Sequence, residues 1–441
     1  MRFHQVLNED LGCASYLLAD GDEAVVVDPR WEVGVYLELA ARAGARITHV
    51  VDTHHHADHV SGRGRLVRRT GATVHAPGDL RPGEELRAGR VRLTALATPG
   101  HRPEHVSFAV RDEARGGEPW CLLAGDSLLV GDVARPDLAV APGEGARELH
   151  ASLERIYGLG DHVELWPGHV GGSLCGGGAL SPKTSSTIGY ERRAGATAGL
   201  DRDAFLALVS GRTPPKPPNV ARIVALNQGP LDTEPAEPAV LRADELDTRA
   251  TVLDARTPED FDRAHLRGAL ALGRGAGRVT RVGWAVDPAE PLVVIDDTLP
   301  RARLLADALH ALGLWNVVGV AAADPEAWFA AGLPVASAGA WDVDELALRL
   351  RARRVGLVDV RDEREYAAGH VPGSVSLPLH VLGDGRGRLA RADRPLAVAC
   401  AVGGRAAFGA SLLRRAGHAD VVRVAGGGVP DLAARGIELA A

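Results

Sequence analysis

Short runs of β-branched and other apolar residues alternate with polar, glycine-containing segments through the first half of the chain. Runs of this length, bounded by turn residues, are typical of buried strands. They cover residues 24–28, 47–51, 91–96, 106–110 and 122–124. Residues 33–43, between the first two runs, carry apolar side chains at helical spacing and predict a helix. The pattern therefore predicts a mixed α/β domain.

A proline-rich stretch ends this pattern. Residues 214–218 read Pro-Pro-Lys-Pro-Pro, and further prolines follow as far as Pro238. Proline cannot continue a helix and is rare inside a sheet, so neither the helical pattern nor the strand pattern continues through this stretch. We therefore place a linker near residues 230–240 and the first domain at residues 1–235.

The segment after the linker contains one pattern twice, which indicates an internal duplication. The matching positions are residues 252–256 with 357–361, Phe261 with Tyr366, His265 with His370, Gly268 with Gly373 and Arg301 with Arg405. Each copy reads strand, helix, strand, loop, helix, which predicts a small parallel sheet covered by helices. We place these two α/β copies at residues 240–336 and 341–441.

Charge and apolar content exclude several classes of function. The net charge of −7 over 441 residues is mild, and acidic and basic residues are interspersed, so no nucleic-acid partner is expected. No apolar run approaches the ~18 residues that span a bilayer, and the first residues show no signal-peptide pattern. Cys13, Cys121, Cys175 and Cys400 lie far apart, which favours thiols kept reduced. We therefore expect a cytoplasmic protein that acts on small molecules.

A histidine-rich loop follows the second predicted strand directly. Residues 53–59 read Thr-His-His-His-Ala-Asp-His and place several potential ligands at one strand end, where a rigid scaffold presents functional groups. Three more potential ligands, His101, Asp126 and His169, each stand just past an apolar run. Imidazole and carboxylate groups suit zinc, iron and related metals. The sequence therefore predicts a metal site built from several strand ends.

At these residues the sequence resembles the metallo-β-lactamase superfamily, whose fold is an αββα sandwich with the metal site at one edge of its two sheets. The resemblance implies two sites that share Asp126: one with His54, His56 and His101, and the other with Asp58, His59 and His169. Hydrolases of the glyoxalase II kind use both metals, with a bridging hydroxide as the nucleophile. Persulfide dioxygenases keep all of these residues but hold a single iron at the positions of His54, His101 and Asp126.

The surroundings of the ligands favour the dioxygenase. Residues 131–138, 166–176 and 185–191 are similar to fusions of a persulfide dioxygenase with rhodanese domains, and no helical glutathione-binding tail of the glyoxalase II kind is evident. The resemblance implies one Fe(II) per chain, with the second site empty, and oxidation of a low-molecular-weight thiol persulfide by O2 to sulfite and thiol. Three protein ligands leave open positions on an octahedral ferrous ion for both substrates.

Two further residues are candidates for the substrate site, each with an ordinary alternative. Arg135 either binds an anionic thiol carrier or serves as a structural hydrogen-bond donor. Cys175 lies in a glycine-rich loop shortly after His169 and is either part of the site or a packed small side chain. Cys13 and Cys121 lie in apolar, strand-like runs, and we interpret both as core residues.

A sulfur-transfer loop is expected near the end of the chain. The apolar run 395–400 ends in Cys400, and Gly403, Gly404 and Arg405 precede a helical stretch. Backbone N–H groups of such a loop stabilise a thiolate or persulfide, and Arg405 adds positive charge. The segment resembles a rhodanese domain, and its loop is one residue shorter than the loop of a related phosphatase. The resemblance implies that Cys400 carries sulfane sulfur and, with sulfite, yields thiosulfate.

The first copy lacks this carrier, because its apolar run 292–295 ends in Asp296 where the second copy has Cys400. A carboxylate cannot carry sulfane sulfur, so we expect the first copy to be catalytically silent.

The chief alternative for the whole chain is a dinuclear zinc thioester hydrolase with rhodanese passengers. A third hypothesis, a non-enzymatic sulfur carrier with a purely structural metal, has less support, because the loop 53–59 and its partners offer more ligands than a closed structural site uses. The thiol carrier, the direction of sulfur transfer and a homo-oligomeric state all stay open.

Overall fold

The strands expected in the first half of the chain form two sheets in the computed structural model, which describes residues 1–171, 173–176, 179–275, 277–383, 389 and 394–440. Gly172, in the motif 166–176, and Ala441 lie outside the described residues. Contacts divide the chain into two units: an N-terminal one (Met1–Lys216, Val220–Glu234 and Ala311–Gly313) and a C-terminal one (Pro217–Asn219, Pro235–His310 and Leu314–Ala441). Each is described by itself.

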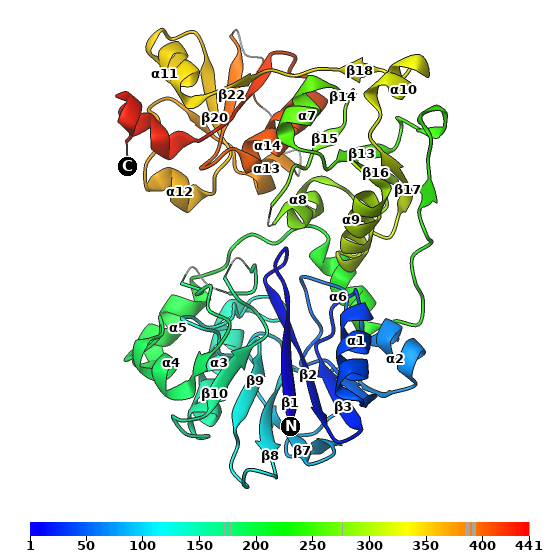
Figure 1. Ribbon diagram of the computed structural model, residues 1–441. Helices are drawn as coiled ribbons and strands as arrows, with labels where there is room; N and C mark the ends of the chain where they lie inside the picture. Colours follow the sequence, from blue (N-terminus) through cyan, green and yellow to red (C-terminus); the bar gives the residue numbers. More distant parts are fainter. Residues whose placement is uncertain (172, 177–178, 276, 384–388, 390–393, 441) are drawn as a thin grey trace. The chain divides into compact units, whose positions relative to one another are not determined.

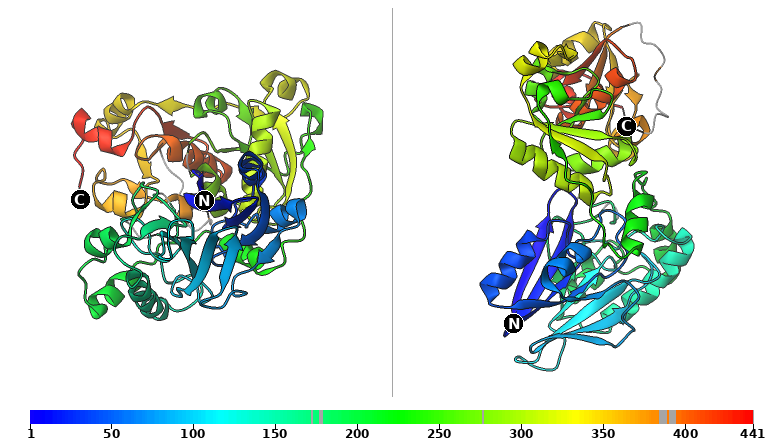
Figure 2. Two further views of the ribbon diagram at one scale, coloured as in Figure 1. Left: turned by 60° about the horizontal axis from the view of Figure 1, so that its bottom comes forward. Right: turned by 90° about the vertical axis from the view of Figure 1, so that its right-hand side faces the viewer.

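The N-terminal unit has two sheets with helices on their outer faces (Figure 1 and Figure 2). The first has the order β1 (Arg2–Asn8), β2 (Cys13–Asp20), β3 (Glu23–Val27), β4 (Arg46–Val51), β5 (Thr73–His75). The second has the order β11 (Ser186–Thr187), β10 (Glu164–Pro167), β9 (Cys121–Gly125), β8 (Val106–Asp112), β7 (Val91–Ala97), β6 (Glu85–Ala88). The helices are α1 (Gly34–Ala43), α2 (Arg63–Thr70), α3 (Pro142–Tyr157), α4 (Ile188–Ala194), α5 (Arg202–Ser210) and α6 (Val220–Gln228).

Alternation along the strands explains the layers. In β2, Tyr16 and Leu18 lie in the core between the sheets, whereas Leu17 and Ala19 lie in the core under α1 and α2. Successive side chains of a strand point to opposite faces, so a strand that is apolar at every position is buried on both. Another core joins the second sheet to α3 and α5. The predicted αββα sandwich is confirmed, as are the helix at residues 33–43 and the predicted strands.

The sandwich places the candidate ligands at four strand ends. The loop 53–59 follows β4, His101 follows β7, Asp126 follows β9 directly, and His169 follows β10. Glycine at position 168 lets the end of β10 lie close to Asp126, because a Cβ on Gly168 would lie 2.7 Å from Oδ1 of Asp126. The fold therefore brings together side chains that are far apart in sequence.

The C-terminal unit contains the repeat as two parallel sheets. The first has the order β12 (Ala239–Val240), β17 (Val317–Ala322), β16 (Leu292–Asp296), β13 (Thr251–Asp254), β15 (Leu270–Ala271). The second has the order β19 (Ala340–Trp341), β23 (Val421–Val424), β22 (Leu396–Ala399), β20 (Gly356–Asp359), β21 (Val375–Ser376). A short ladder joins β14 (His265–Leu266) to β18 (Val335–Ala336). The predicted pair of parallel α/β copies is confirmed.

Helices cover both sheets of this unit. The first copy has α7 (Pro258–Arg263), α8 (Arg278–Ala285), α9 (Leu299–Ala311) and α10 (Pro325–Ala330), with the 3-10 turn η1 (Ala243–Glu245). The second has α11 (Val343–Arg351), α12 (Glu363–Ala367), α13 (Leu379–Gly383) and α14 (Gly404–Arg415), with η2 (Val429–Arg435). Among the described residues, no helix of either unit is both long and apolar enough to cross a membrane.

The residues repeated in sequence make the same contacts in each copy. The guanidinium of Arg256 binds Asp254 and donates to the carbonyl of Ala264 at 2.6 Å. Arg361 binds Asp359 and donates to the carbonyl of Gly369 at 2.7 Å. Buried, paired charges of this kind tie a strand end to the following turn. Their retention in both copies is therefore explained by the fold alone.

Candidate metal centre and sulfur-transfer loop

The side chains of His54, His101 and Asp126 meet in the interior of the N-terminal unit. Nε2 of His101 lies 3.4 Å and Nε2 of His54 lies 3.7 Å from Oδ2 of Asp126. All three residues are fully buried. Burial lowers the pKa of both imidazoles, so each ring is neutral and has a lone pair to offer. Although burial opposes ionisation of Asp126, the charge and hydrogen bond of His169 hold its pKa below the usual value.

These facing atoms fit a metal ion. Among the described residues, Nε2 of His54, Nε2 of His101 and Oδ2 of Asp126 have no hydrogen-bond partner. Buried polar atoms are normally paired, and three unpaired acceptors that converge on one point are the arrangement expected of metal ligands. The donor set, two imidazoles and one carboxylate, leaves room for further ligands around the ion.

Neighbouring groups orient the two rings. Thr53 donates its hydroxyl to Asp28 at 2.9 Å, so Nδ1 of His54 must donate to Thr53, also at 2.9 Å. Nδ1 of His101 donates to the carbonyl of Arg135 at 2.9 Å. In each ring the proton therefore sits on Nδ1, and Nε2 keeps its lone pair toward the candidate ion.

A second group of potential ligands lies beside the first and is paired differently. His169 places Nδ1 at 2.7 Å from Oδ1 of Asp126 and Nε2 at 2.8 Å from Oδ2 of Asp58. Nδ1 of His59 lies 3.1 Å from the other oxygen of Asp58. Both nitrogens of His169 are therefore engaged by carboxylates, and their charges raise its pKa well above the usual value against the effect of burial.

Three residues of this region were not assigned to the site from sequence. The buried sulfur of Cys13 lies 2.9 Å from Asp58 and 3.6 Å from His59, so interpreting Cys13 as core alone is incomplete. His105 accepts the backbone N–H of Asp126 at 2.8 Å, and burial lowers its pKa to about 3. Asp28 binds the backbone N–H of Thr53 at 2.6 Å and also Nε2 of His56 at 3.1 Å.

The two candidate substrate-site residues are both buried. The guanidinium of Arg135 binds Asp137 through two contacts of 2.7 and 2.8 Å and also donates to Pro214. These contacts within the protein favour the structural interpretation of Arg135. The thiol of Cys175 groups with Asp126 and His169, and burial raises its pKa well above the usual value. Cys175 therefore adjoins the candidate metal centre as a neutral thiol.

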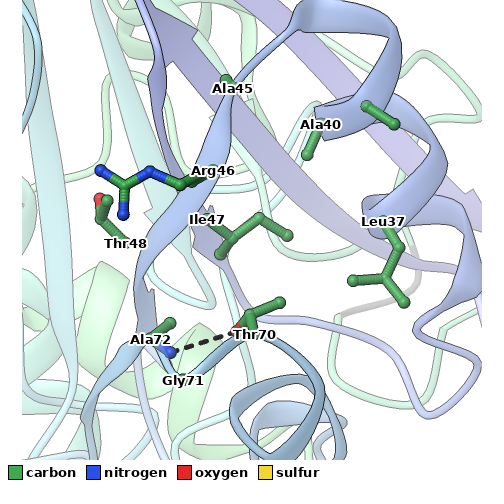
Figure 3. Close-up of a pocket in the computed structure, with 10 residues that line it drawn as sticks. Leu37, Ala40, Ala45, Arg46, Ile47, Thr48, Thr70, Gly71 and Ala72 are labelled. Carbon is green, nitrogen blue, oxygen red and sulfur yellow. Dashed lines mark hydrogen bonds between the residues drawn. The ribbon is translucent and has the colours of Figure 1, made fainter.

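A groove elsewhere on the N-terminal unit carries none of this chemistry. It has a volume of about 400 Å³ and lies where α1 and the ends of β4 and α2 meet (Figure 3). Its described lining is Leu37, Ala40, Ala41, Ala45, Arg46, Ile47, Thr48, Thr70, Gly71 and Ala72, which includes no histidine, cysteine or carboxylate. This groove therefore lacks the metal-binding side chains of the strand-end site.

In the C-terminal unit, Cys400 stands where the sequence places it, at the end of β22. The thiol is buried, and its sulfur accepts the backbone N–H of Gly403 at 3.0 Å. Gly403 has φ +95°, a conformation that favours glycine, and α14 begins at Gly404. The loop thus directs a backbone donor and a helix N-terminus toward the sulfur, as its glycines predict.

Arg405 lies beside this loop but is already paired. Its guanidinium makes two contacts with the carboxylate of Glu365, at 2.5 and 2.7 Å. Hydrogen bonding to Arg405 lowers the pKa of Glu365 to about 2. The positive charge expected from Arg405 near Cys400 is therefore largely balanced by Glu365, a residue that the sequence pattern did not single out.

The loop of the first copy is built differently. Asp296 is buried at the end of β16, and Arg274 contacts its two oxygens at 2.7 and 3.1 Å. Leu299 and Pro300 occupy the positions of Gly403 and Gly404 in the repeat. Proline has no N–H, and leucine disfavours positive φ, so the donors that surround Cys400 have no equivalent at these two positions.

Comparison with known proteins supports the division seen in the structure. The metallo-beta-lactamase superfamily model matches residues 8–82, and the rhodanese-like domain model matches residues 238–331 and 342–434. A solved metallo-beta-lactamase from Staphylococcus aureus aligns with a TM-score of 0.66 and 27% identity, covering 73% of this chain and 99% of that one. The chain therefore joins a metallo-β-lactamase domain to two rhodanese-like domains.

Curated relatives narrow the class of the N-terminal domain. The human mitochondrial persulfide dioxygenase ETHE1 is 29% identical over 234 residues, which are 50% of this chain and 85% of that protein. The hydroxyacylglutathione hydrolase of Methylococcus capsulatus is 35% identical over 154 residues, 32% of this chain and 56% of that protein. The N-terminal domain is therefore a homologue of the persulfide dioxygenases, with a shorter match to the hydrolases.

Proposed function

We propose that the N-terminal domain is a mononuclear iron persulfide dioxygenase and that it supplies sulfite to sulfur transfer at Cys400. The observation that carries the first part is the set of three buried acceptors, on His54, His101 and Asp126, that face one another without partners. Two imidazoles and a carboxylate form the facial triad typical of non-haem Fe(II). The match to persulfide dioxygenases over most of their length supports the same assignment.

The proposed reaction converts R–S–SH, O2 and water into R–SH, sulfite and two protons. The Fe(II) ion would supply open positions at which persulfide and dioxygen bind side by side. Thr53 and the carbonyl of Arg135 would hold the ligand rings in the required tautomer. His105 would fix the backbone of Asp126 as a neutral acceptor. These groups would position the ligands.

We assign one Fe(II) per chain, because the chain matches persulfide dioxygenases over most of their length and the hydrolases over a shorter stretch. Asp58, His59 and His169 lie together as a second ligand group, and Nε2 of His59 has no partner among the described residues. The ligands alone therefore fit one metal or two, and the measured metal content discriminates between the two functions.

Cys400 would then exchange sulfane sulfur with two partners. Its thiolate attacks the terminal sulfur of R–S–SH, which releases R–S⁻ and leaves Cys400–S–SH. Sulfite takes that sulfur to form thiosulfate and restores the thiol. The N–H of Gly403 stabilises the anionic sulfur at both stages. Since Cys13, Cys121, Cys175 and Cys400 are all free, we place the protein in a reducing compartment such as the cytosol.

Metal analysis and oxygen uptake test the metal assignment directly. The protein purified without oxygen should hold about one iron per chain, and thiol persulfides should drive O2 consumption. His54→Ala or Asp126→Ala should abolish both. His55→Ala is the matched control, because His55 is adjacent on the same loop but binds Glu104 at 2.7 Å. Two zinc ions per chain with thioester hydrolysis and no O2 uptake would instead establish the dinuclear hydrolase.

A further inference from the structure

The silent first rhodanese copy contacts the elements that carry Cys400. Helix α14 follows the Cys400 loop directly, and all of its residues from Ala406 to Leu413 are buried. The equivalent helix of the first copy, α9, keeps a solvent-exposed side, with Leu304 65% exposed. A helix that is buried all round is covered by more than its own sheet. Part of the additional cover of α14 comes from α13 of the second copy, and part comes from the first copy.

Two contacts show how α14 is held. Ala407 lies in the apolar core of the first copy, with Phe261 and Trp328. The hydroxyl of Ser411 accepts the N–H of Ala271 at 3.0 Å and donates to the carbonyl of Phe408, one turn earlier, at 2.7 Å. Ala271 belongs to β15, the edge strand of the first sheet, whose outward N–H would otherwise lack a strand partner. The first copy is thereby bonded to the helix that begins beside Cys400.

A buried ion pair holds the neighbouring strand. Arg423 on β23 is 5% exposed and contacts Asp262 at 2.5 Å and Glu259 at 2.8 Å, both on α7 of the first copy. Strand β23 pairs with β22, the strand that ends at Cys400. Two of the elements that surround the sulfur, α14 and β23, are therefore tied to the silent copy through the buried side chains of Ser411 and Arg423, whose polar contacts have defined directions as well as strength.

From these contacts we infer that the first rhodanese copy positions the active-site loop of the second, with Ser411 and Asp262 as positioning residues. The distance from the N–H of Gly403 to the sulfur depends on where α14 begins, and the first copy holds that helix at Ala407 and Ser411. Loss of the Ser411 contact should let α14 move. Loss of the Asp262 contact should let β23 move, and β23 is bonded to α14 through Arg414, which donates to the carbonyl of Val421 at 2.9 Å. Either loss should weaken the donor to Cys400. The inference rests on the proposed role of Cys400 as a sulfur carrier.

Full-length variants test this positioning from both sides of the contact. Ser411→Ala and Asp262→Asn should each lower the kcat of sulfur transfer from thiosulfate to cyanide by about tenfold and slow the reaction of Cys400 with iodoacetamide at neutral pH. The labelling profile of the Cys400 peptide across pH 6 to 10 is measured by mass spectrometry. Persulfide-dependent O2 uptake should stay at the wild-type rate.

Matched controls separate positioning from stability. Asp260→Asn removes contacts to Thr257 and Arg263 inside the first copy, and Ser374→Ala removes a hydrogen bond to Val371 inside the second. Both should keep the wild-type labelling profile even where the melting temperature falls. The inference is overturned if folded Ser411→Ala and Asp262→Asn also keep that profile.

Labelling also keeps the outcome independent of the proposed function. Iodoacetamide needs no sulfur substrate, so a wild-type chain without transferase activity would refute sulfur transfer while the labelling profiles still decide the positioning. Asp262→Asn preserves side-chain size and leaves Glu259 in contact with Arg423. It therefore remains a test if Ser411→Ala fails to fold.

Discussion

Replacing Glu365 by glutamine removes the negative charge that pairs with Arg405 beside the sulfur-transfer loop. At neutral pH Glu365 is ionised, because Arg405 lowers its pKa to about 2 from an ordinary value of 4.5. That shift corresponds to about 3 kcal/mol, but the carboxylate is 32% exposed and solvent screening reduces it to about 1 kcal/mol. A carboxyl group whose pKa is lowered by folding stabilises the folded protein above about pH 4.5, and this stabilisation is lost as the pH falls toward 2. Glu365→Gln should therefore cost about 1 kcal/mol of unfolding free energy at pH 7.

The same substitution leaves Arg405 with an unbalanced positive charge near the thiol. This charge attracts the thiolate, so Cys400 should react faster with iodoacetamide at neutral pH than in the wild type. Iodoacetamide labelling of the Cys400 peptide across pH 6 to 10 measures the change. Glu363→Gln is the matched control, because Glu363 lies on the same helix but pairs with His380 at 3.1 Å. An unchanged labelling profile in folded Glu365→Gln would refute the electrostatic argument.

Three further outcomes follow from the structure. The Cys400→Ser variant should lose sulfur transfer but keep persulfide-dependent O2 uptake, and it should accumulate sulfite where the wild type releases thiosulfate. Equal sulfite-to-thiosulfate ratios in the variant and the wild type, measured by anion chromatography, would rule out the coupling. Chelation of the metal should remove O2 uptake but leave transfer from thiosulfate to cyanide intact, and loss of both would contradict separate sites. Burial lowers the pKa of His265 to about 4. Below about pH 6.5 the unfolded chain therefore binds a proton at His265 that the folded protein does not, so the free energy of unfolding declines as the pH falls from 6.5 toward 4. His265→Gln should reduce this pH dependence by about 1–2 kcal/mol in chemical denaturation, and an unchanged dependence would show that other groups cause it.

The sequence predicts those features that depend on local pattern. Strands such as β4 and β9 are apolar runs that end at a turn, and donors that directly follow them must lie at a sheet edge. The fold brings together His54, His101 and Asp126, the set that the resemblance to persulfide dioxygenases implies, whereas the pattern alone predicts only a metal site at several strand ends. The repeat was visible for the same reason, since residues 252–256 and 357–361 form equivalent strand ends.

Features that depend on tertiary packing were not predictable in this way. Cys13 lies in an apolar strand and has no local mark of contact with Asp58, which is distant in sequence. Glu365 is one of several acidic residues in a short helix, and only the folded structure pairs it with Arg405. The contact of Ala271 with Ser411 joins two separate copies of the repeat. Such pairings arise from the arrangement of whole elements, which periodicity does not encode.

The different loop of the first copy bears on whether a thiol alone could make that copy active. Changing Asp296 to cysteine would restore a thiol at the strand end, but Leu299 and Pro300 would still stand where Gly403 and Gly404 form the donor loop. Arg274 would also lose the buried carboxylate that it contacts. Restoring the thiol alone should therefore not give the first copy a working sulfur-transfer loop.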